Sequence, residues 1–353
     1  MKRPATLHRG HRRTWLPWTV AVTGLLLMAL INVSVGPVSI PVREILQLLS
    51  EKLSLSTTAG EFSVTSSIIV FDIRLPNMVL MAMTGMALAG SGAVFQGLFR
   101  NPLADPYIIG VASGAGLGAV LAMAAHWPAD VLGMAVVPAA AFVGAIATVF
   151  VVYGIARVGR STPVTTLILA GVAVSSFATA ITSLIMMLSS DELHRAVNWM
   201  VGGFSLGGWA PVLASIPYLA IGLGILVSLG RPLNVLQFGD DQARQLGLNV
   251  DRLKLVLVIA ASMVAATAVS FSGIIAFVGL VVPHIVRLIW GSDYRRLIPL
   301  AIILGGAFLL GADVVARVLL APRELPVGVV TAAVGAPFFL YLLHRTKTKL
   351  GFW

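Results

Sequence analysis

Apolar residues in this chain are grouped into long uncharged runs that are separated by short charged segments. A helix needs about 20 largely apolar residues to cross the hydrocarbon core of a membrane. Runs of this kind cover residues 14–42, 75–99, 106–129, 131–156, 161–190, 196–230, 255–286, 297–312 and 325–344. The run 255–286 is too long for one crossing and is interrupted by Ser-Phe-Ser-Gly at 270–273, so we divide it there. The pattern predicts ten transmembrane helices, the ninth extending to about Arg317.

Composition supports a membrane protein and excludes other classes. Hydrophobic residues make up 58% of the 353 residues and charged residues 11%, and the mean hydropathy is +0.95. About a quarter of the residues of an ordinary soluble domain are charged. A soluble enzyme, a disordered chain and a nucleic-acid-binding domain are therefore excluded, in spite of the net charge of +10. The chain has no cysteine, which excludes disulfides and thiolate metal sites. We expect one all-α polytopic membrane domain over residues 1–353.

The basic residues predict the orientation of the chain in the membrane. If the loops alternate and the N-terminus lies inside, 18 of the 24 Lys and Arg residues lie on the inside. Cytoplasmic loops carry such an excess of Lys and Arg. We therefore expect both termini, including residues 1–14, to face the cytoplasm. The basic residues expected outside are Arg43, Lys52, Arg74, Arg195, Arg317 and Arg323.

Two loops are longer than the others. Residues 43–74 form an outer loop. Residues 231–254 form a charged inner segment in which apolar residues recur at helical spacing, which predicts short amphipathic helices at the membrane surface. This segment divides the chain into two five-helix halves. Because each half crosses the membrane an odd number of times, the two halves are expected to be inverted relative to each other.

Two motifs that carry enzyme chemistry are absent from the sequence. There is no phosphate-binding G-x-x-x-x-G-K and no H-E-x-x-H. Any uphill transport would draw its energy from another subunit. A secondary transporter driven by an ion gradient is the main alternative, and it requires an intramembrane carboxylate or a helix broken at the midplane. An intramembrane enzyme requires a dyad or metal ligands at depth, where His284 stands alone, more readily a structural group than a ligand.

Five collinear segments carry a resemblance to a known family. They are RLPNMVLMAMTGMALAGSGAVFQGLFRNPLADPYIIGVASGAGLG (74–118), LILAGVAVSSF (167–177), GDDQARQLGLNV (239–250), GIIAFVGLVVPHIVRLIWGSDYRRLIPL (273–300) and ADVVARVLLAPRELPVGVVTAAVGAPFFLYLL (312–343). The chain from about residue 70 onward resembles the FecCD/BtuC-like family of ABC-importer permeases for iron siderophores, haem and cobalamin.

The resemblance implies a type II ABC importer permease in the inner membrane of a prokaryote. It implies a homodimer surrounded by lipid, two cytoplasmic ATPase subunits and a substrate-binding protein outside. ATP and magnesium would bind to the ATPases, so no cofactor or metal is expected in this chain, and no nucleic acid is a partner. The substrate would pass between the fifth and tenth helices of the two copies.

The resemblance also implies three sites. The ATPase-coupling residues are Gly239, Asp240, Asp241, Gln242, Ala243, Arg244, Leu246 and Gly247. The residues that receive the binding protein are Arg74, Arg317 and Arg323, where Arg323 replaces an arginine that the family often has at the position of Asn77. The cytoplasmic gate consists of Ser161, Thr162, Thr165 and Thr166.

Each of these sites has a simpler alternative. The coupling segment could be a solvated linker, and Arg74 could be a helix end whose side chain reaches the membrane surface. Ser161 or Thr162 could cap a helix, with Pro163 in its first turn. An iron chelate (a siderophore or haem) is favoured as substrate by its frequency in the family, and cobalamin or an oxyanion remains open.

Overall fold

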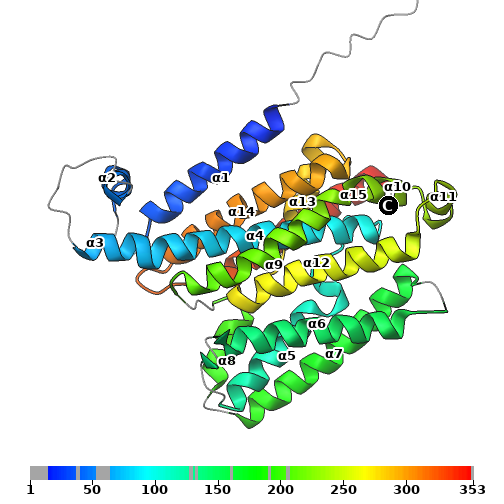
Figure 1. The fold of residues 1–353 in the computed structure, drawn as a ribbon, viewed down its shortest axis with the longest axis horizontal. Coiled ribbons are helices and arrows are strands. Elements are labelled where there is room, and N and C mark those ends of the chain that lie inside the picture. Colours follow the sequence, from blue (N-terminus) through cyan, green and yellow to red (C-terminus); the bar gives the residue numbers. More distant parts are fainter. Residues whose placement is uncertain are drawn as a thin grey trace, which may run out of the picture.

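The computed structural model describes residues 15–36, 40–52, 64–126, 130–131, 134–159, 162–189, 192–203 and 207–350. These residues form helices and connecting loops, together with one antiparallel pair of two-residue strands, β1 (Asp130–Val131) and β2 (Met134–Ala135). The helices run roughly parallel to one another as an elongated bundle (Figure 1). The fold is therefore all-helical, as the sequence predicts.

In the part of the chain that the structure describes, seven helical segments are long and apolar enough to cross a membrane. They are α1 (Leu16–Ser34), Thr65–Leu98, α6 (Val136–Ala156), α7 (Val164–Leu188), α9 (Ala210–Ser228), α12 (Val250–Ser272) and α14 (Tyr294–Val318). Three shorter apolar helices are α5 (Val111–Ala124), α13 (Val278–Trp290) and the first part of α15 (Val327–Leu350). Each of these ten helices overlaps one of the predicted spans.

The helix α4 (Leu75–Leu98) forms the centre of the bundle and packs against α9, α12, α13 and α14. Small residues let these helices approach closely. A Cβ atom on Gly85 would overlap the carbonyl oxygen of Gly305 on α14, and one on Gly92 would overlap that of Gly279 on α13. Membrane helices associate through such close van der Waals packing, because lipid is as apolar as their side chains. Gly85 and Gly92 thus lie in a packing seam along α4.

The second predicted span begins earlier than its apolar run. Residues 43–74 were expected to be an outer loop, but they contain α2 (Val42–Lys52), α3 (Val64–Ile68) and the π-helical turn η1 (Ile69–Arg74), which continues into α4. Pro76 has no N–H for the carbonyl of Asp72, and a wider turn accommodates a residue of this kind. The indole Nε1 of Trp209 donates to the carbonyl of Phe71 at 3.0 Å. Asp72 and Arg74 end the uncharged run without ending the helix.

Two further predicted spans are shorter than their runs. The run 14–42 contains α1, which ends at Ser34, and reaches only the first residue of α2. The run 196–230 covers most of α8 (Leu193–Met200) and all of α9. Glycines with positive φ, Gly202, Gly207 and Gly208, lie between these two helices. Glycine adopts this backbone without steric cost, so an apolar run can turn where hydropathy alone predicts one helix.

Two apolar runs contain non-α-helical segments, and these two segments contact each other. The run 106–129 starts with the 3₁₀ turn η2 (Pro106–Ile109), and Gly110 (φ 91°) then begins α5. The run 255–286 is divided between Ser272 and Val278, as predicted from its length. The hydroxyl of Tyr107 donates to the carbonyl of Ile275 at 2.9 Å and joins the two interruptions.

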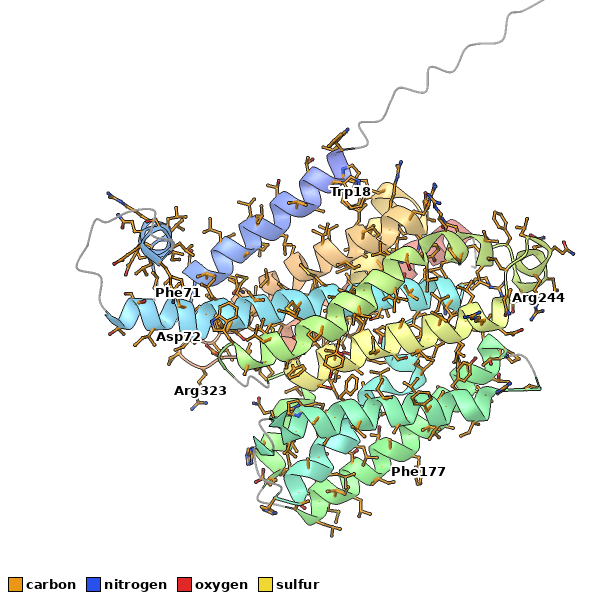
Figure 2. The ribbon with its side chains drawn as sticks, in the orientation of Figure 1. Trp18, Phe71, Asp72, Phe177, Arg244 and Arg323 are labelled. Carbon is orange, nitrogen blue, oxygen red and sulfur yellow. The ribbon has the colours of Figure 1, made fainter. Side chains whose placement is uncertain are left out.

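The two ends of the bundle carry different elements. Figure 1 shows the short helices α10 (Gly230–Leu236) and α11 (Asp240–Gln245) at one end, with the C-terminal part of α15, and α2, α3 and α8 at the other. Arg244 and Arg323 lie at these opposite ends in Figure 2. The structure therefore separates the predicted coupling segment from the predicted outer arginines by the length of the bundle.

Candidate functional site

The predicted coupling residues form a helical hairpin, α10 and α11, at one end of the bundle. Gly239 occupies the N-cap position of α11 with φ 108° and ψ 159°, a conformation that is essentially restricted to glycine. Gly247 ends the helix with φ 86°. Its N–H bonds the carbonyl of Arg244, and that of Leu248 bonds the carbonyl of Ala243, both at 3.0 Å, as in a Schellman C-cap. The two glycines thus define where α11 begins and ends.

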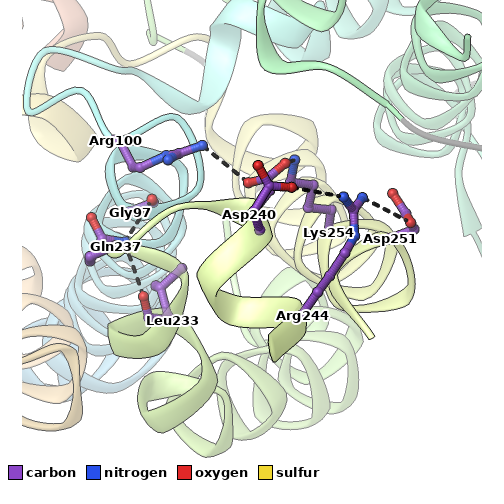
Figure 3. A network of polar contacts seen from close by, with 9 residues as sticks. Gly97, Arg100, Leu233, Gln237, Asp240, Arg244, Asp251 and Lys254 are labelled. Carbon is purple, nitrogen blue, oxygen red and sulfur yellow. Dashed lines mark hydrogen bonds and ion pairs between the residues drawn. The ribbon is translucent and has the colours of Figure 1, made fainter. Parts of the chain in front are cut away.

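Charged side chains of α11 face two directions (Figure 3). Asp240 Oδ1 lies 3.1 Å from Arg100 Nη2, and Asp240 Oδ2 pairs with Lys254 Nζ. Arg244 lies 3.5 Å from Asp241 and 3.4 Å from Asp251. Asp240 therefore faces the bundle.

The outer face of the hairpin is open. Asp241 has a side chain that is 93% exposed. Gln242, Arg244, Leu246 and Phe238 are also exposed, whereas Ala243 is buried. The hairpin thus presents an apolar and charged outer surface on a helix whose inner side is anchored.

The helix α10 is fixed to the ends of α4 and α14. Gln237 Nε2 donates to the carbonyl of Gly97 at 2.9 Å. Asn234 Nδ2 donates to Asp293 Oδ1 at 2.6 Å, and its Oδ1 accepts from the N–H of Tyr294 at 2.9 Å. The guanidinium of Arg295 bonds Asp293 and, against the effect of burial, holds the pKa of this carboxyl well below its usual range. Asp293 stays ionised and connects α10 to the start of α14.

Arg74 and Arg317, the first two predicted docking residues, are buried at the opposite end of the bundle. Their exposed fractions are 7% and 8%. Arg74 Nη1 donates to the carbonyl of Val33 at 2.8 Å, and Arg317 donates to the carbonyls of Asn32 and Val35 at 3.1 Å each. The last carbonyls of a helix have no intrahelical donor and carry partial negative charge. The two guanidinium groups therefore bind the C-terminal end of α1.

A buried carboxylate completes this cluster. Asp313, which is 4% exposed, accepts from Arg317 Nη2 at 2.6 Å and from Asn32 Nδ2 at 2.8 Å. The sequence pattern gave no reason to expect a carboxylate inside the bundle, because Asp313 lies close to the end of its apolar run. Its full pairing with Arg317 fits a structural anchor better than an ion path.

Arg323, the third predicted docking residue, lies in the loop between α14 and α15. It is exposed, and Figure 2 shows it away from the body of the bundle. The structure does not bring Arg323 into the buried Arg74–Arg317 cluster.

Three of the predicted gate residues, Thr162, Thr165 and Thr166, lie at the start of α7, and the fourth, Ser161, is outside the described residues. Thr162 is buried and Thr165 is exposed. The hydroxyl of Thr166 donates to the carbonyls of Ala156 at 2.9 Å and Pro163 at 2.8 Å. Pro163 occupies the N-cap position, so the expectation that Thr162 caps this helix is wrong, and proline lacks a side-chain acceptor for such a cap.

Two cavities in the described part of the chain have different linings. One, about 600 Å³, is mainly apolar, is bounded by α1, α13, α14 and α15 and includes Phe308 and Val330. Another, about 290 Å³, contains Ser113, Ser175 and Thr179. His284 packs edge-on against Phe338 and Phe339, with ring centroids 6.4 and 6.0 Å away. Among the described residues, no three His, Asp or Glu side chains gather to hold a metal ion.

The long apolar helices and the charged ends of the bundle define a class, the multi-pass membrane proteins. Comparison with known proteins assigns the family: the model of the FecCD transport family matches residues 24–345, and the chain belongs to this family. The resemblance seen in the sequence is thus confirmed.

Individual relatives agree with this assignment. The chain is 38% identical over 346 residues to the uncharacterized ABC transporter permease protein YvrB of Bacillus subtilis (strain 168), and the match covers 98% of each chain. It is 47% identical over 285 residues to the cobalamin import system permease protein BtuC of Halobacterium salinarum, covering 81% of this chain and 76% of that one. A solved inward-facing structure of a metal-chelate type ABC transporter superimposes with a TM-score of 0.78 at 28% identity, covering 94% of this chain and 99% of that one.

Proposed function

We propose that this chain is the permease subunit of an ATP-driven ABC importer in the cytoplasmic membrane of a prokaryote. The observation that carries the proposal is the α10–α11 hairpin, which is anchored to the bundle on one side and open on the other. It belongs to a chain that lacks a nucleotide-binding motif and is similar to ABC permeases over nearly its whole length. The seven long and three shorter apolar helices make ten crossings in two inverted halves, with both termini in the cytoplasm.

The partner at the hairpin is an ABC ATPase, with two copies for a permease dimer. Exposed Asp241 and Leu246 supply a charged and an apolar contact on one small helix. An apolar anchor surrounded by polar groups is typical of a protein–protein contact. ATP and magnesium bind to that partner.

At the opposite end, a substrate-binding protein docks beside Arg74, Arg317 and Arg323. The exposed Arg323 supplies the charge that steers an acidic partner, and such rim charges act mainly on the association rate. The gate consists of Ser161, Thr162, Thr165 and Thr166, of which the three threonines lie at the start of α7. The pathway lies between two copies of the chain.

The substrate is a large metal chelate, either an iron chelate or cobalamin. Two comparisons support this class, the identity of 47% with a cobalamin permease and the superposition on a metal-chelate type transporter. Cobalamin is therefore the first substrate to test.

Purification from the native membrane tests the proposed function. The chain carries an affinity tag and is extracted in mild detergent, and we expect an ABC ATPase to co-elute with it in equal amount. Replacing the exposed residues Asp241 and Leu246 with alanine should reduce co-elution, whereas alanine at Val143, an exposed apolar residue of α6, should not. The proposal would be contradicted if the wild-type chain transported cobalamin in native vesicles but no ATPase co-eluted with it or with the Val143 variant.

A further inference from the structure

Asp240 differs from the other charged residues of α11 in the direction it faces. Its side chain is 28% exposed and contacts Arg100 and Lys254, whereas the side chain of Asp241, the next residue, is 93% exposed. Lys254 belongs to the first turns of α12, and Arg100 follows the last turn of α4. One carboxylate of the hairpin thus bridges two helices of the bundle, as Figure 3 shows.

The lysine of this bridge depends on Asp240. The Lys254 side chain is 6% exposed, and Asp240 is its one ion-pair partner among the described residues. An ammonium group buried without a partner is strongly destabilising. The pair therefore holds α11 firmly against α12.

The arginine of the bridge lies on a backbone that favours glycine. Arg100 has φ 50° and occupies the C′ position of a Schellman motif. Its N–H bonds the carbonyl of Gly97 at 3.2 Å, and the next N–H bonds that of Gln96 at 3.1 Å. A residue with a side chain is disfavoured in this conformation. The ion pair between its guanidinium and Asp240 offsets the backbone strain that an arginine has at this position and a glycine would not have.

These contacts form a connection between the exposed hairpin and the core of the bundle. The helix α12 packs along α4 and α9, and α4 packs along α13 and α14. A displacement of α11 therefore acts on α12 and on the end of α4 through Asp240, in addition to the more exposed Arg244–Asp251 pair between α11 and α12.

We propose that Asp240 is a positioning residue that clamps the coupling helix to α12 and α4, and that it transmits movement of the bound ATPase to these helices. Asp241 contacts the partner. Only the transmission of ATPase movement rests on the proposed function, because the clamp itself is a property of this chain alone.

The clamp can be tested on the purified chain without a partner. Amide hydrogen exchange over residues 239–247 is compared for the wild type, Asp240→Asn and Asp241→Asn. We expect about tenfold faster exchange in Asp240→Asn, because local opening becomes easier, and no change in Asp241→Asn. Equal protection in all three proteins would overturn the clamp. Arg100→Gln, which alters a partly exposed side chain, gives the same test if Asp240→Asn does not fold.

Transmission is tested in the reconstituted complex with its ATPase, by measuring ATPase affinity and the amount of chelate transported for each ATP hydrolysed. Asp240→Asn should bind the ATPase with unchanged affinity and lower this ratio about tenfold. Asp241→Asn should weaken ATPase binding and leave the ratio unchanged. Lys254→Met should also lower the ratio, but by less than Asp240→Asn does, because Arg100 still pairs with Asp240. The double variant should lower it no further than Asp240→Asn alone.

Other outcomes separate the two proposals. Weaker ATPase binding by Asp240→Asn with an unchanged ratio would make Asp240 a contact residue and overturn transmission. Transmission would also be overturned if the amount of chelate transported for each ATP hydrolysed were unchanged in both Asp240→Asn and Lys254→Met. A wild-type chain that binds no ATPase would contradict the proposed function, while the exchange measurement would still decide the clamp.

Discussion

Buried charges at both ends of this bundle are held by partners that a hydropathy pattern does not identify. Asn32 and Asp313 are 281 residues apart in the sequence and 2.8 Å apart in the fold. Lys254 pairs with Asp240 across the turn between α11 and α12. A hydropathy pattern places such residues near helix ends, but it does not show with which other side chain each of them is paired and buried. The sequence therefore predicted the arginines as rim residues, and the structure shows that Arg74 and Arg317 also bind the end of α1.

Asp105 supports a prediction on pH dependence. It lies between α4 and η2, and burial raises the pKa of its carboxyl to about 6, although the N–H of Tyr107 bonds it at 2.8 Å. The folded state thus prefers the protonated form. The stability from this preference is present below the ordinary pKa of about 4 and is lost as pH rises through about 6.

Asp105→Asn should remove this dependence, because an asparagine amide does not titrate. Its side-chain oxygen still accepts from the N–H of Tyr107, so the local structure is kept. Between pH 4 and pH 7, the free energy of unfolding of the wild type should fall relative to the variant by roughly 2–3 kcal/mol. Thermal unfolding in detergent at both pH values measures the difference. Parallel pH profiles for the two proteins would show that Asp105 titrates normally.

At the scale of elements, hydropathy located the apolar helices well and their ends poorly. The division of 255–286 was predictable, because its length exceeds one crossing. The extension of the second span back to Thr65 was not, because Asp72 and Arg74 interrupt the uncharged run without interrupting the helix. The separation of α8 from α9 depends on glycines with positive φ, which hydropathy does not register. The glycine-bounded α11 was predicted as a short amphipathic helix, although the direction of Asp240 was not.

The crossing of α4 and α14 provides a prediction on packing. Gly85→Leu would force a side chain into the backbone of Gly305, so the helices must separate. We expect a loss of about 3 kcal/mol in the free energy of unfolding, or failure to fold. Gly224→Leu on α9 is the matched control, because nothing lies within 4 Å of its added Cβ. Thermal unfolding in detergent and size-exclusion elution compare the two variants, and equal stability would contradict the packing seam.

At the scale of the whole molecule, the two ends are expected to face different compartments. The chain has no cysteine, so single cysteines can report this directly. Phe238 and Arg323 are exposed at opposite ends of the bundle. In right-side-out membrane vesicles, Arg323→Cys should react with a membrane-impermeant thiol reagent, and Phe238→Cys should react only after permeabilisation. The opposite pattern would invert the topology, and labelling of both residues from outside would contradict the count of ten crossings.

The energy source of transport tests the central claim most directly. The chain is reconstituted into liposomes with its co-purified ATPase and the cognate binding protein, and uptake of cobalamin or an iron chelate is followed. The account predicts accumulation that requires ATP and persists when proton and sodium gradients are collapsed by ionophores. Accumulation by the permease alone, driven by an imposed ion gradient and indifferent to ATP, would contradict it and identify a secondary transporter.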